Sequence, residues 1–202
     1  MIKNIVFDVG MVLVDFKWRQ VMESIGCTPE EIETIAAVMV NGPLWNELDR
    51  GVMEEEDVIA QMVAQLPGLE EKAWDFWNHI HLTIESFPYA ADWVRGFKEE
   101  GYHTFLLTNY PRSLYRNTAE QYFTFLPYVE NVLVSSHEKM IKPDEAIYER
   151  LLEMFDLKAE ETVFIDDRLV NIEGAERVGI KGIHFTNYEE VNAKLRKILD
   201  EE

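Results

Sequence analysis

The chain has 202 residues, and its 19 lysines and arginines stand against 38 aspartates and glutamates, which gives a formal net charge of −19. Nucleic acids and anionic membranes both require a basic surface, so this charge argues against either as a partner. The hydrophobic content of 47% and the aromatic content of 12% are too high for a disordered acidic chain. The length suits one domain with or without an insertion.

Cysteine content and hydropathy narrow the class further. Cys27 is the single cysteine, which excludes an internal disulfide and fits a reducing compartment. No run reaches the ~20 apolar residues of a membrane-spanning helix, and the start MIKNIVFDVG lacks the apolar segment of a signal peptide. We therefore expect a soluble, cytoplasmic protein that is a monomer or a weak homodimer.

Short apolar runs that end in polar residues predict the strands of a parallel sheet. In chain order these runs are IVF from Ile5, TFLL from Thr104, VLV from Val132, VFI from Val163 and, as a fifth candidate, GIHFT from Gly182. Helical patterns such as DEAIYERLLEMFDL lie between them. This alternation implies a parallel sheet with helices on both faces, and such sheets bind ligands at the carboxyl ends of their strands.

The segment from Phe16 to Ser86 interrupts this alternation. It shows helical patterns over 18–25, 29–40, 55–66 and 73–86, separated by turns, and no strand-like run. We predict an α/β fold with two parts. Residues 1–15 and 87–202 form a doubly wound, parallel five-stranded sheet with its helices, and residues 16–86 form a small helical cap over the active edge.

Three carboxylates are expected to meet at that edge, since Asp8 follows the first strand and Asp166-Asp167 follow a later one. A carboxylate can attack phosphorus and form an aspartyl-phosphate, although it can also simply cap a turn or a helix. Three unpaired carboxylates in one pocket repel each other and raise each other's pKa. A hard divalent cation such as Mg²⁺ relieves this repulsion.

Four motifs then make a family resemblance specific: FDVGMVLVD, LLTN, KP and FIDDRLVN occur in this order, each after or beside the appropriate strand. Over nearly its whole length the chain resembles the haloacid dehalogenase-like (HAD) hydrolase superfamily, in the branch with a helical cap between the first two motifs. The resemblance implies that Mg²⁺ is held by the Asp8 side chain, the Gly10 carbonyl and Asp166. Asp167 would act mostly through water.

The resemblance also implies a site for the phosphoryl group. Thr108 and the backbone around Asn109 would hydrogen-bond the oxygens of the transferred group. Lys142, directly before Pro143, would neutralise charge on both Asp8 and the phosphate.

The predicted cap is expected to select the substrate. Its turn-rich stretch NGPLWNELDRG could reach into the pocket. Trp45 would then stack on a sugar face, and Arg50 would bind a second anionic or hydroxylated group. The alternative is a buried Trp45 beside an exposed Arg50.

Position 10 departs from the pattern of most phosphatases in the superfamily. They carry a second Asp two residues after the nucleophile, which protonates the leaving oxygen and later activates water, whereas this chain has Gly10. General acid–base catalysis contributes ~10²–10⁴-fold, so this step is the one in question. Asp15 either serves through water or packs at the base of the cap.

We therefore favour a Mg²⁺-dependent phosphomonoester hydrolase that acts on a small phosphorylated metabolite through an aspartyl-phosphate on Asp8. A sugar phosphate such as an aldose 1-phosphate is a candidate substrate, because an anomeric leaving group needs less protonation. The first alternative is a non-catalytic phosphate-binding or scaffolding protein. The second is a haloacid dehalogenase, which uses no metal and leaves the pair Asp166-Asp167 unexplained.

Overall fold

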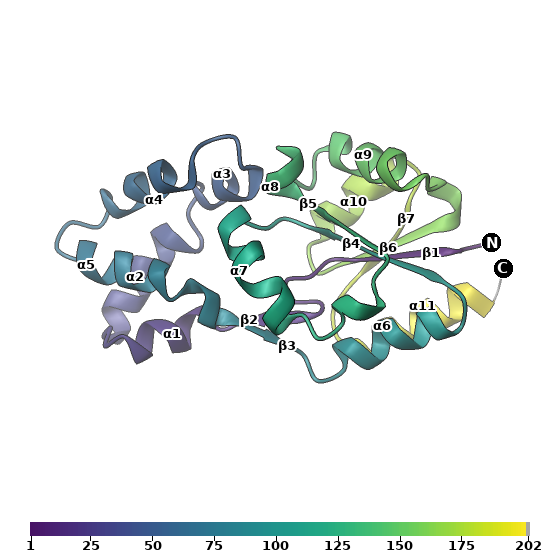
Figure 1. Ribbon diagram of the computed structural model, residues 1–202, viewed down its shortest axis with the longest axis horizontal. Coiled ribbons are helices and arrows are strands. Elements are labelled where there is room, and N and C mark those ends of the chain that lie inside the picture. Colours follow the sequence, from purple (N-terminus) through teal and green to yellow (C-terminus); the bar gives the residue numbers. More distant parts are fainter. Residues whose placement is uncertain (201–202) are drawn as a thin grey trace.

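The computed structural model describes residues 1–200, with five parallel strands at the centre of one part and helices alone filling most of the other (Figure 1). The strands are ordered β5-β4-β1-β6-β7. Their bounds are Asn4–Phe7 for β1, His103–Thr108 for β4, Asn131–Val134 for β5, Thr162–Asp166 for β6 and Lys181–His184 for β7. Later strands add on both sides of β1, so the predicted doubly wound, parallel five-stranded sheet is confirmed.

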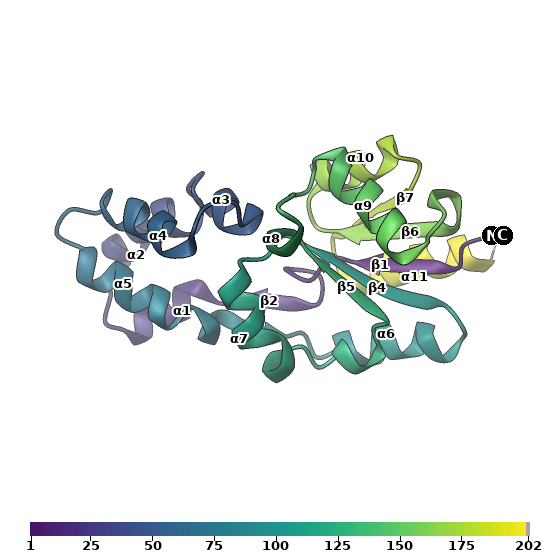
Figure 2. The ribbon, with the colours of Figure 1, turned by 45° about the horizontal axis from the view of Figure 1, so that its top comes forward.

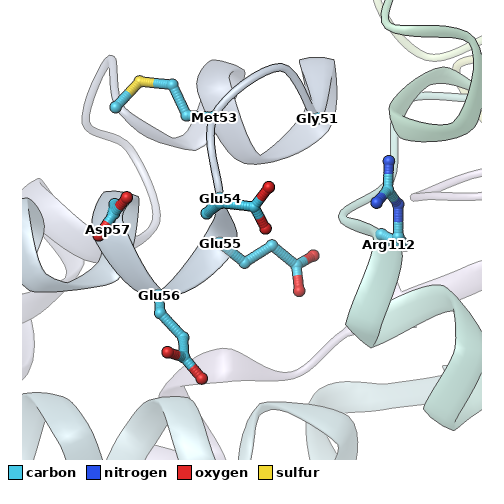
Figure 3. Close-up of a pocket in the computed structure, with 7 residues that line it drawn as sticks. All are labelled: Gly51, Met53, Glu54, Glu55, Glu56, Asp57 and Arg112. Carbon is cyan, nitrogen blue, oxygen red and sulfur yellow. The ribbon is translucent and has the colours of Figure 1, made fainter.

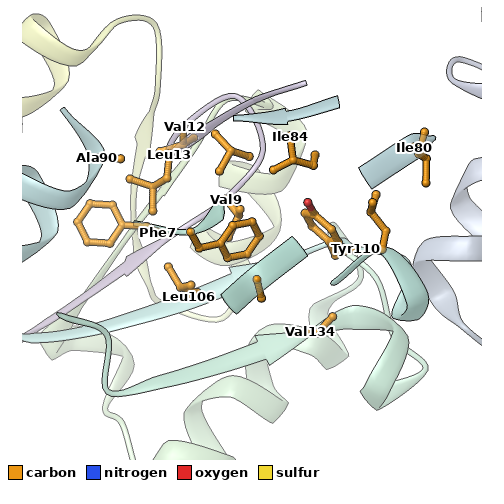
Figure 4. Close-up of a cluster of buried hydrophobic side chains, with 14 of the residues drawn as sticks. Phe7, Val9, Val12, Leu13, Ile80, Ile84, Ala90, Leu106, Tyr110 and Val134 are labelled. Atoms are coloured by element: carbon orange, nitrogen blue, oxygen red, sulfur yellow. The ribbon is translucent and has the colours of Figure 1, made fainter. Parts of the chain in front are cut away.

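Helices cover both faces of this sheet. They are α6 (Ala90–Glu99), α7 (Arg112–Tyr122), α9 (Glu145–Phe155), α10 (Leu169–Arg177) and α11 (Tyr188–Asp200). Because successive strand residues point to opposite faces, Val6 packs into the cluster formed with α9 and α10, whereas Phe7 packs into the larger cluster with α6 and α11. Figure 4 shows that the larger cluster runs on from Phe7 through Tyr110 to Ile84 and Ile80.

The helical part, called the cap below, lies between β2 (Val14–Phe16) and β3 (Ile84–Ser86), two short strands that pair antiparallel with each other. Its elements are α1 (Trp18–Ser24), α2 (Pro29–Met39), α3 (Trp45–Arg50), α4 (Glu55–Val63), α5 (Glu70–Asn78) and the 3₁₀ helix η1 (Ile80–Thr83). Figure 2 shows β2 beside the sheet-containing part, which we call the body. The division at residues 16–86 stays a prediction. Within residues 1–200, no helix is long and apolar enough to cross a membrane.

Two elements of the cap differ from the sequence-based expectation. The predicted helix over 73–86 ends at Asn78 and continues as η1 and β3, and the turn-rich stretch around Trp45 contains α3. The strand β3 has 3 residues, too few to show an alternating pattern. The helix α3 has 6 residues and packs on α8 (Ser135–Glu138) of the body, so a contact far away in the sequence stabilises it.

Candidate active site

A cavity of about 460 Å³ opens at the carboxyl ends of β1, β4 and β6, where body and cap meet. This is the point at which strand order reverses, the usual place for a ligand in a doubly wound sheet. The body contributes Asp8, Gly10, Met11, Asn109, Lys142, Asp167, Arg168 and Asn171, and the cap contributes Phe16, Val40, Asn41, Gly42, Pro43, Trp45, Asn46 and Asp49.

A buried lysine joins two of the strand ends. The Nζ atom of Lys142 lies 2.8 Å from Oδ1 of Asp8 and 2.6 Å from Oδ2 of Asp166, and it donates to the Leu107 carbonyl at 3.1 Å. These contacts use all three donors of the ammonium group. Burial alone would lower the pKa of Lys142, but the two carboxylates raise it above its usual value. Lys142 is therefore a fixed cation inside the site.

The position of Lys142 is set by the residue that follows β4. Asn109 accepts a hydrogen bond from the Lys142 backbone N–H at 2.9 Å and donates one to the Lys142 carbonyl at 3.1 Å. This reciprocal pair ties the end of β4 to the loop before α9. The Asn109 side chain thus acts on the placement of the lysine, a role that sequence reasoning had not assigned to it.

Asp166 is fully buried and held from two sides. Its Oδ1 accepts a hydrogen bond from the Arg168 N–H at 2.8 Å, and Nδ2 of Asn171 lies 3.0 Å from each of its two oxygens. Together with the Lys142 ammonium, these donors occupy both oxygens of the carboxyl group. The Asp166 side chain is therefore fixed in one orientation at the end of β6.

Asp8, Asp166 and Asp167 form a compact group of carboxylates, with one oxygen of each within 4.8 Å of the others. Burial raises the pKa of Asp8 to about 8, with Lys142 opposing the rise and Asp166 adding to it. The pKa of Asp167 is also raised, by burial and by the charge of Asp166. When all three carboxylates are ionised, they leave two negative charges beyond the one that Lys142 balances, and a divalent cation with a preference for oxygen ligands would balance these two. The residues therefore fit such an ion.

The remaining predicted site residues lie in different surroundings. Thr108 is buried at the end of β4 and is not among the residues that line the cavity. Trp45 does line the cavity, with its ring centroid 5.6 Å from that of Phe16. Arg50 points elsewhere, since its Nη1 is 3.4 Å from a carboxylate oxygen of Asp144. Roles for Thr108 and Arg50 stay predictions.

Two cavity residues were not predicted as site residues. Arg168 directly follows the Asp166-Asp167 pair, so its place in the chain was a usable signal. Asp49 is 5% exposed, and its Oδ1 has no hydrogen-bond partner. Burial raises the pKa of Asp49 to about 7, against the opposing effects of Lys142, Arg168 and a hydrogen bond from Trp45. No sequence pattern marks Asp49, because its burial depends on how the cap packs on the body.

An apolar groove of about 150 Å³ continues from the cavity toward the paired strands β2 and β3. It shares residues such as Gly10, Phe16 and Trp45 with the cavity. Its remaining walls come from separate parts of the chain, namely Val14, Ile84, Tyr110, Pro111 and Leu114. The site therefore has a charged end at Asp8 and an apolar end under β3.

A separate cavity of about 400 Å³ lies where α4 meets α7, and it has a different character. Figure 3 shows the carboxylates of Glu54 and Glu55 facing the side chain of Arg112. Glu55 accepts a hydrogen bond from the Ser113 N–H at 2.9 Å and so caps the start of α7. Glu56 and Asp57 also line this cavity, so its negative charge repels anions. The Glu55–Ser113 hydrogen bond at its edge joins the cap to the body.

Comparisons with known proteins agree with this geometry. A model of the haloacid dehalogenase-like hydrolase family matches residues 2–179. A sesquiterpene phosphatase of Aspergillus oryzae is 28% identical over 98% of this chain and 96% of its own length. A D-ribitol-5-phosphate phosphatase of Bacteroides thetaiotaomicron is 24% identical over 99% of this chain and 100% of its own.

Among solved structures, a HAD family enzyme from Bacteroides thetaiotaomicron in complex with magnesium and inorganic phosphate has a TM-score of 0.73 at 20% identity. The match covers 92% of this chain and 95% of that one, and it shows a shared fold. The family match spans the strands β1, β4, β5 and β6, the cap and the cavity residues between them. The resemblance seen in the four sequence motifs is therefore confirmed, and the chain belongs to the haloacid dehalogenase-like hydrolase family.

Proposed function

We propose that the protein is a Mg²⁺-dependent phosphomonoester hydrolase that acts on a small phosphorylated metabolite through an aspartyl-phosphate on Asp8. The observation that carries this proposal is the Asp8–Lys142–Asp166 arrangement at the switch point of the sheet. Family membership and the two relatives named as phosphatases support an enzyme of this class. They favour it over a non-catalytic phosphate-binding protein and over a dehalogenase.

Asp8 would be the nucleophile. Its Oδ1 accepts hydrogen bonds from the Val9 N–H at 2.7 Å and from Lys142, which leaves Oδ2 for attack on phosphorus. Lys142 has no spare donor, so in our proposal it holds Asp8 in place and balances its charge. Arg168, which is exposed at the cavity, and the backbone after Thr108 would bind the oxygens of the phosphoryl group.

The cofactor in this proposal is Mg²⁺, held by the side chains of Asp8, Asp166 and Asp167 and by the Gly10 carbonyl. When bound, it would neutralise charge on the phosphoryl oxygens. The fit rests on the carboxylate oxygens lying within 4.8 Å of one another and on the two negative charges that Lys142 leaves uncompensated. A magnesium complex of a structural neighbour is consistent with this choice of metal.

The groove favours an apolar alcohol as the leaving part of the substrate. An apolar cavity of ~150 Å³ holds a molecule the size of benzene, so a groove of about 150 Å³ has room for about six carbon atoms. Sugar hydroxyls would lose their hydration there without gaining partners. A sesquiterpene, the compound class in the name of the Aspergillus oryzae relative, is also apolar. An aldose 1-phosphate is the second candidate, supported by the absence of an acid at Gly10 and by the Trp45 ring in the cavity.

A chain-length series tests both the function and the substrate class. With Mg²⁺ present, we expect the wild type to release phosphate from p-nitrophenyl phosphate and from n-alkyl phosphates. The Asp8→Asn variant should release none, and a chelator should abolish the activity of the wild type. Each buried methylene contributes about 0.8 kcal/mol, so kcat/KM should rise about fourfold per carbon until the groove is full. A flat series together with faster hydrolysis of an aldose 1-phosphate would favour the sugar substrate instead. No release from any ester would contradict the function itself.

A further inference from the structure

The reaction proposed above needs a proton at the leaving oxygen, and position 10 cannot supply it. An alkoxide is a poor leaving group, so an acid must act on any alkyl phosphate. A Cβ added at Gly10 would meet no atom within 4 Å, so the space beside this position is open and holds no acid. We propose, on the basis of the proposed function, that Asp49 of the cap is the general acid and base of this site.

Asp49 has the surroundings that such a group requires. It lines the same cavity as Asp8 and Lys142, it is buried, and its Oδ1 has no hydrogen-bond partner. An unpartnered carboxyl oxygen costs stability unless a ligand group completes it, so its retention in the cavity points to a substrate contact. The groups that interact electrostatically with Asp49 are Lys142 before α9, Arg168 before α10 and Tyr110 after β4. Trp45, on the same helix α3, hydrogen-bonds to the carboxyl group.

Asp49 also stands apart from the metal-binding carboxylates. Within residues 1–200, the group whose oxygens lie within 4.8 Å of one another consists of Asp8, Asp166 and Asp167 and does not include Asp49. No ion pair within 4.0 Å joins Asp49 to a lysine or arginine of this part of the chain. Its carboxyl group is therefore free to exchange a proton. Burial supports this role, since it holds the pKa of Asp49 at about 7.

The backbone of Asp49 is fixed to the body although α3 belongs to the cap. Oγ of Ser135 donates a hydrogen bond to the Asp49 carbonyl at 2.6 Å. Gly51, two residues on, has φ +65°, and a Cβ there would lie 2.5 Å from the carbonyl oxygen of Ser136. Only glycine permits so close an approach in the left-handed region. Asp49 thus lines the cavity from a helix end that is held against α8.

The proton balance of both half-reactions can be written with Asp49 alone. In the first, Asp8 attacks phosphorus, the P–O bond to the alcohol breaks, and the ester oxygen takes the proton of Asp49. In the second, water attacks the aspartyl-phosphate and gives a proton to the Asp49 carboxylate. The P–O bond to Asp8 breaks, its electron pair returns to the Asp8 carboxylate, and inorganic phosphate leaves. Asp49 ends the cycle protonated, as it began.

The test compares two leaving groups in the Asp49→Asn variant with Mg²⁺ present. For n-hexyl phosphate, we expect kcat/KM to fall by ~10²–10⁴-fold, the usual contribution of a general acid. For p-nitrophenyl phosphate, whose leaving group needs no proton, kcat/KM should change less than about fivefold, which also shows that the variant is folded. Turnover of this ester should slow after a burst of one nitrophenolate per enzyme, because the aspartyl-phosphate then waits for an activated water.

Two further measurements use the same esters. Glu47→Gln is the matched control, since Glu47 is on the same helix and does not line the cavity, and it should leave both kcat/KM values unchanged. When Gly10→Asp is added to Asp49→Asn, kcat/KM for hexyl phosphate should rise at least about tenfold above that of Asp49→Asn alone, because the new side chain places an acid in the open space. The fall of kcat/KM above about pH 7 for hexyl phosphate should be steeper in the wild type than in Asp49→Asn. The ionisation of the phosphate ester affects both enzymes equally, so it does not contribute to the difference between their pH profiles.

Several outcomes would overturn the assignment. Equal losses of kcat/KM on the two esters would mean that Asp49 only binds or positions the substrate. An Asp49→Asn enzyme that hydrolyses hexyl phosphate at the wild-type rate would also refute it. So would a double variant that keeps its activity on p-nitrophenyl phosphate and recovers none on hexyl phosphate. If the wild type hydrolyses neither ester, the failure lies with the proposed function and not with Asp49.

Discussion

The stability of the protein should depend on pH through Asp49, and the Asp49→Asn substitution isolates this dependence. The side chain is buried, one of its oxygens has no partner, and burial raises its pKa from 3.8 to about 7. Asparagine has nearly the same shape and cannot ionise. It therefore removes the titration and keeps the packing of α3 on the body.

The sign and size of the effect follow from linkage. A carboxyl group whose pKa is higher in the folded chain holds its proton more tightly there than in the unfolded chain. Its contribution to stability is complete below the unfolded pKa and is lost as the pH rises from about 4 to about 7. A pKa shift from 3.8 to about 7 lowers the free energy of unfolding at alkaline pH by about 4 kcal/mol, because each pKa unit corresponds to about 1.4 kcal/mol. Between about pH 5 and pH 8, the loss is about 2–3 kcal/mol.

Urea unfolding in the presence of a chelator measures this directly. The free energy of unfolding of Asp49→Asn minus that of the wild type should increase by about 2–3 kcal/mol between pH 5 and pH 8. The change with pH is the observable, because an unsatisfied polar atom in the asparagine adds the same offset at both values. Glu47→Gln, on the same helix, should change this difference by less than about 0.5 kcal/mol. A difference for Asp49→Asn that stays constant with pH would refute the reasoning from burial.

Three further predictions concern the rest of the site. Lys142→Met should lower the free energy of unfolding, measured in urea, by about 3–5 kcal/mol, because it leaves the buried carboxylates of Asp8 and Asp166 without their cation. An unchanged urea midpoint would contradict the coupling between this lysine and the two carboxylates. Gly51→Ala should destabilise the protein by at least about 1 kcal/mol more than Gly68→Ala in the same assay, because both positions have positive φ but only the first approaches Ser136. Added Mg²⁺ should raise the Tm of the wild type in a concentration-dependent way and have a much smaller effect on Asp167→Asn, whereas equal shifts would place the ion elsewhere.

Much of the fold could be predicted because its signals are local. The strands β1, β4 and β6 are short apolar runs followed at once by polar residues, and the helices between them show a 3.6-residue period. Parallel strands in alternation with helices bring their carboxyl ends to one edge. That rule alone placed Asp8 beside Asp166 and Asp167, and the KP motif added Lys142.

The same local signals do not determine how side chains are used. Asn109 was expected near the phosphoryl group through its backbone, and its side chain holds the Lys142 backbone. Two places were open for Arg50, in the pocket or on the surface, and its side chain lies against Asp144. A helix of 6 residues such as α3 has too few turns to predict which of its faces meets the body.

Sequence by itself determined the class of this protein: a doubly wound sheet with a carboxylate cluster and a lysine at one edge, on a chain of net charge −19. Only the tertiary structure brought together the groups that we propose for acid–base chemistry and for substrate selection. Asp49 acquires its raised pKa by burial where α3 of the cap is held against Ser135 of the body. The apolar groove joins residues 14, 84 and 114, which are distant along the chain. Burial and side-chain proximity arise when the cap packs on the body, so no local pattern in the chain encodes them.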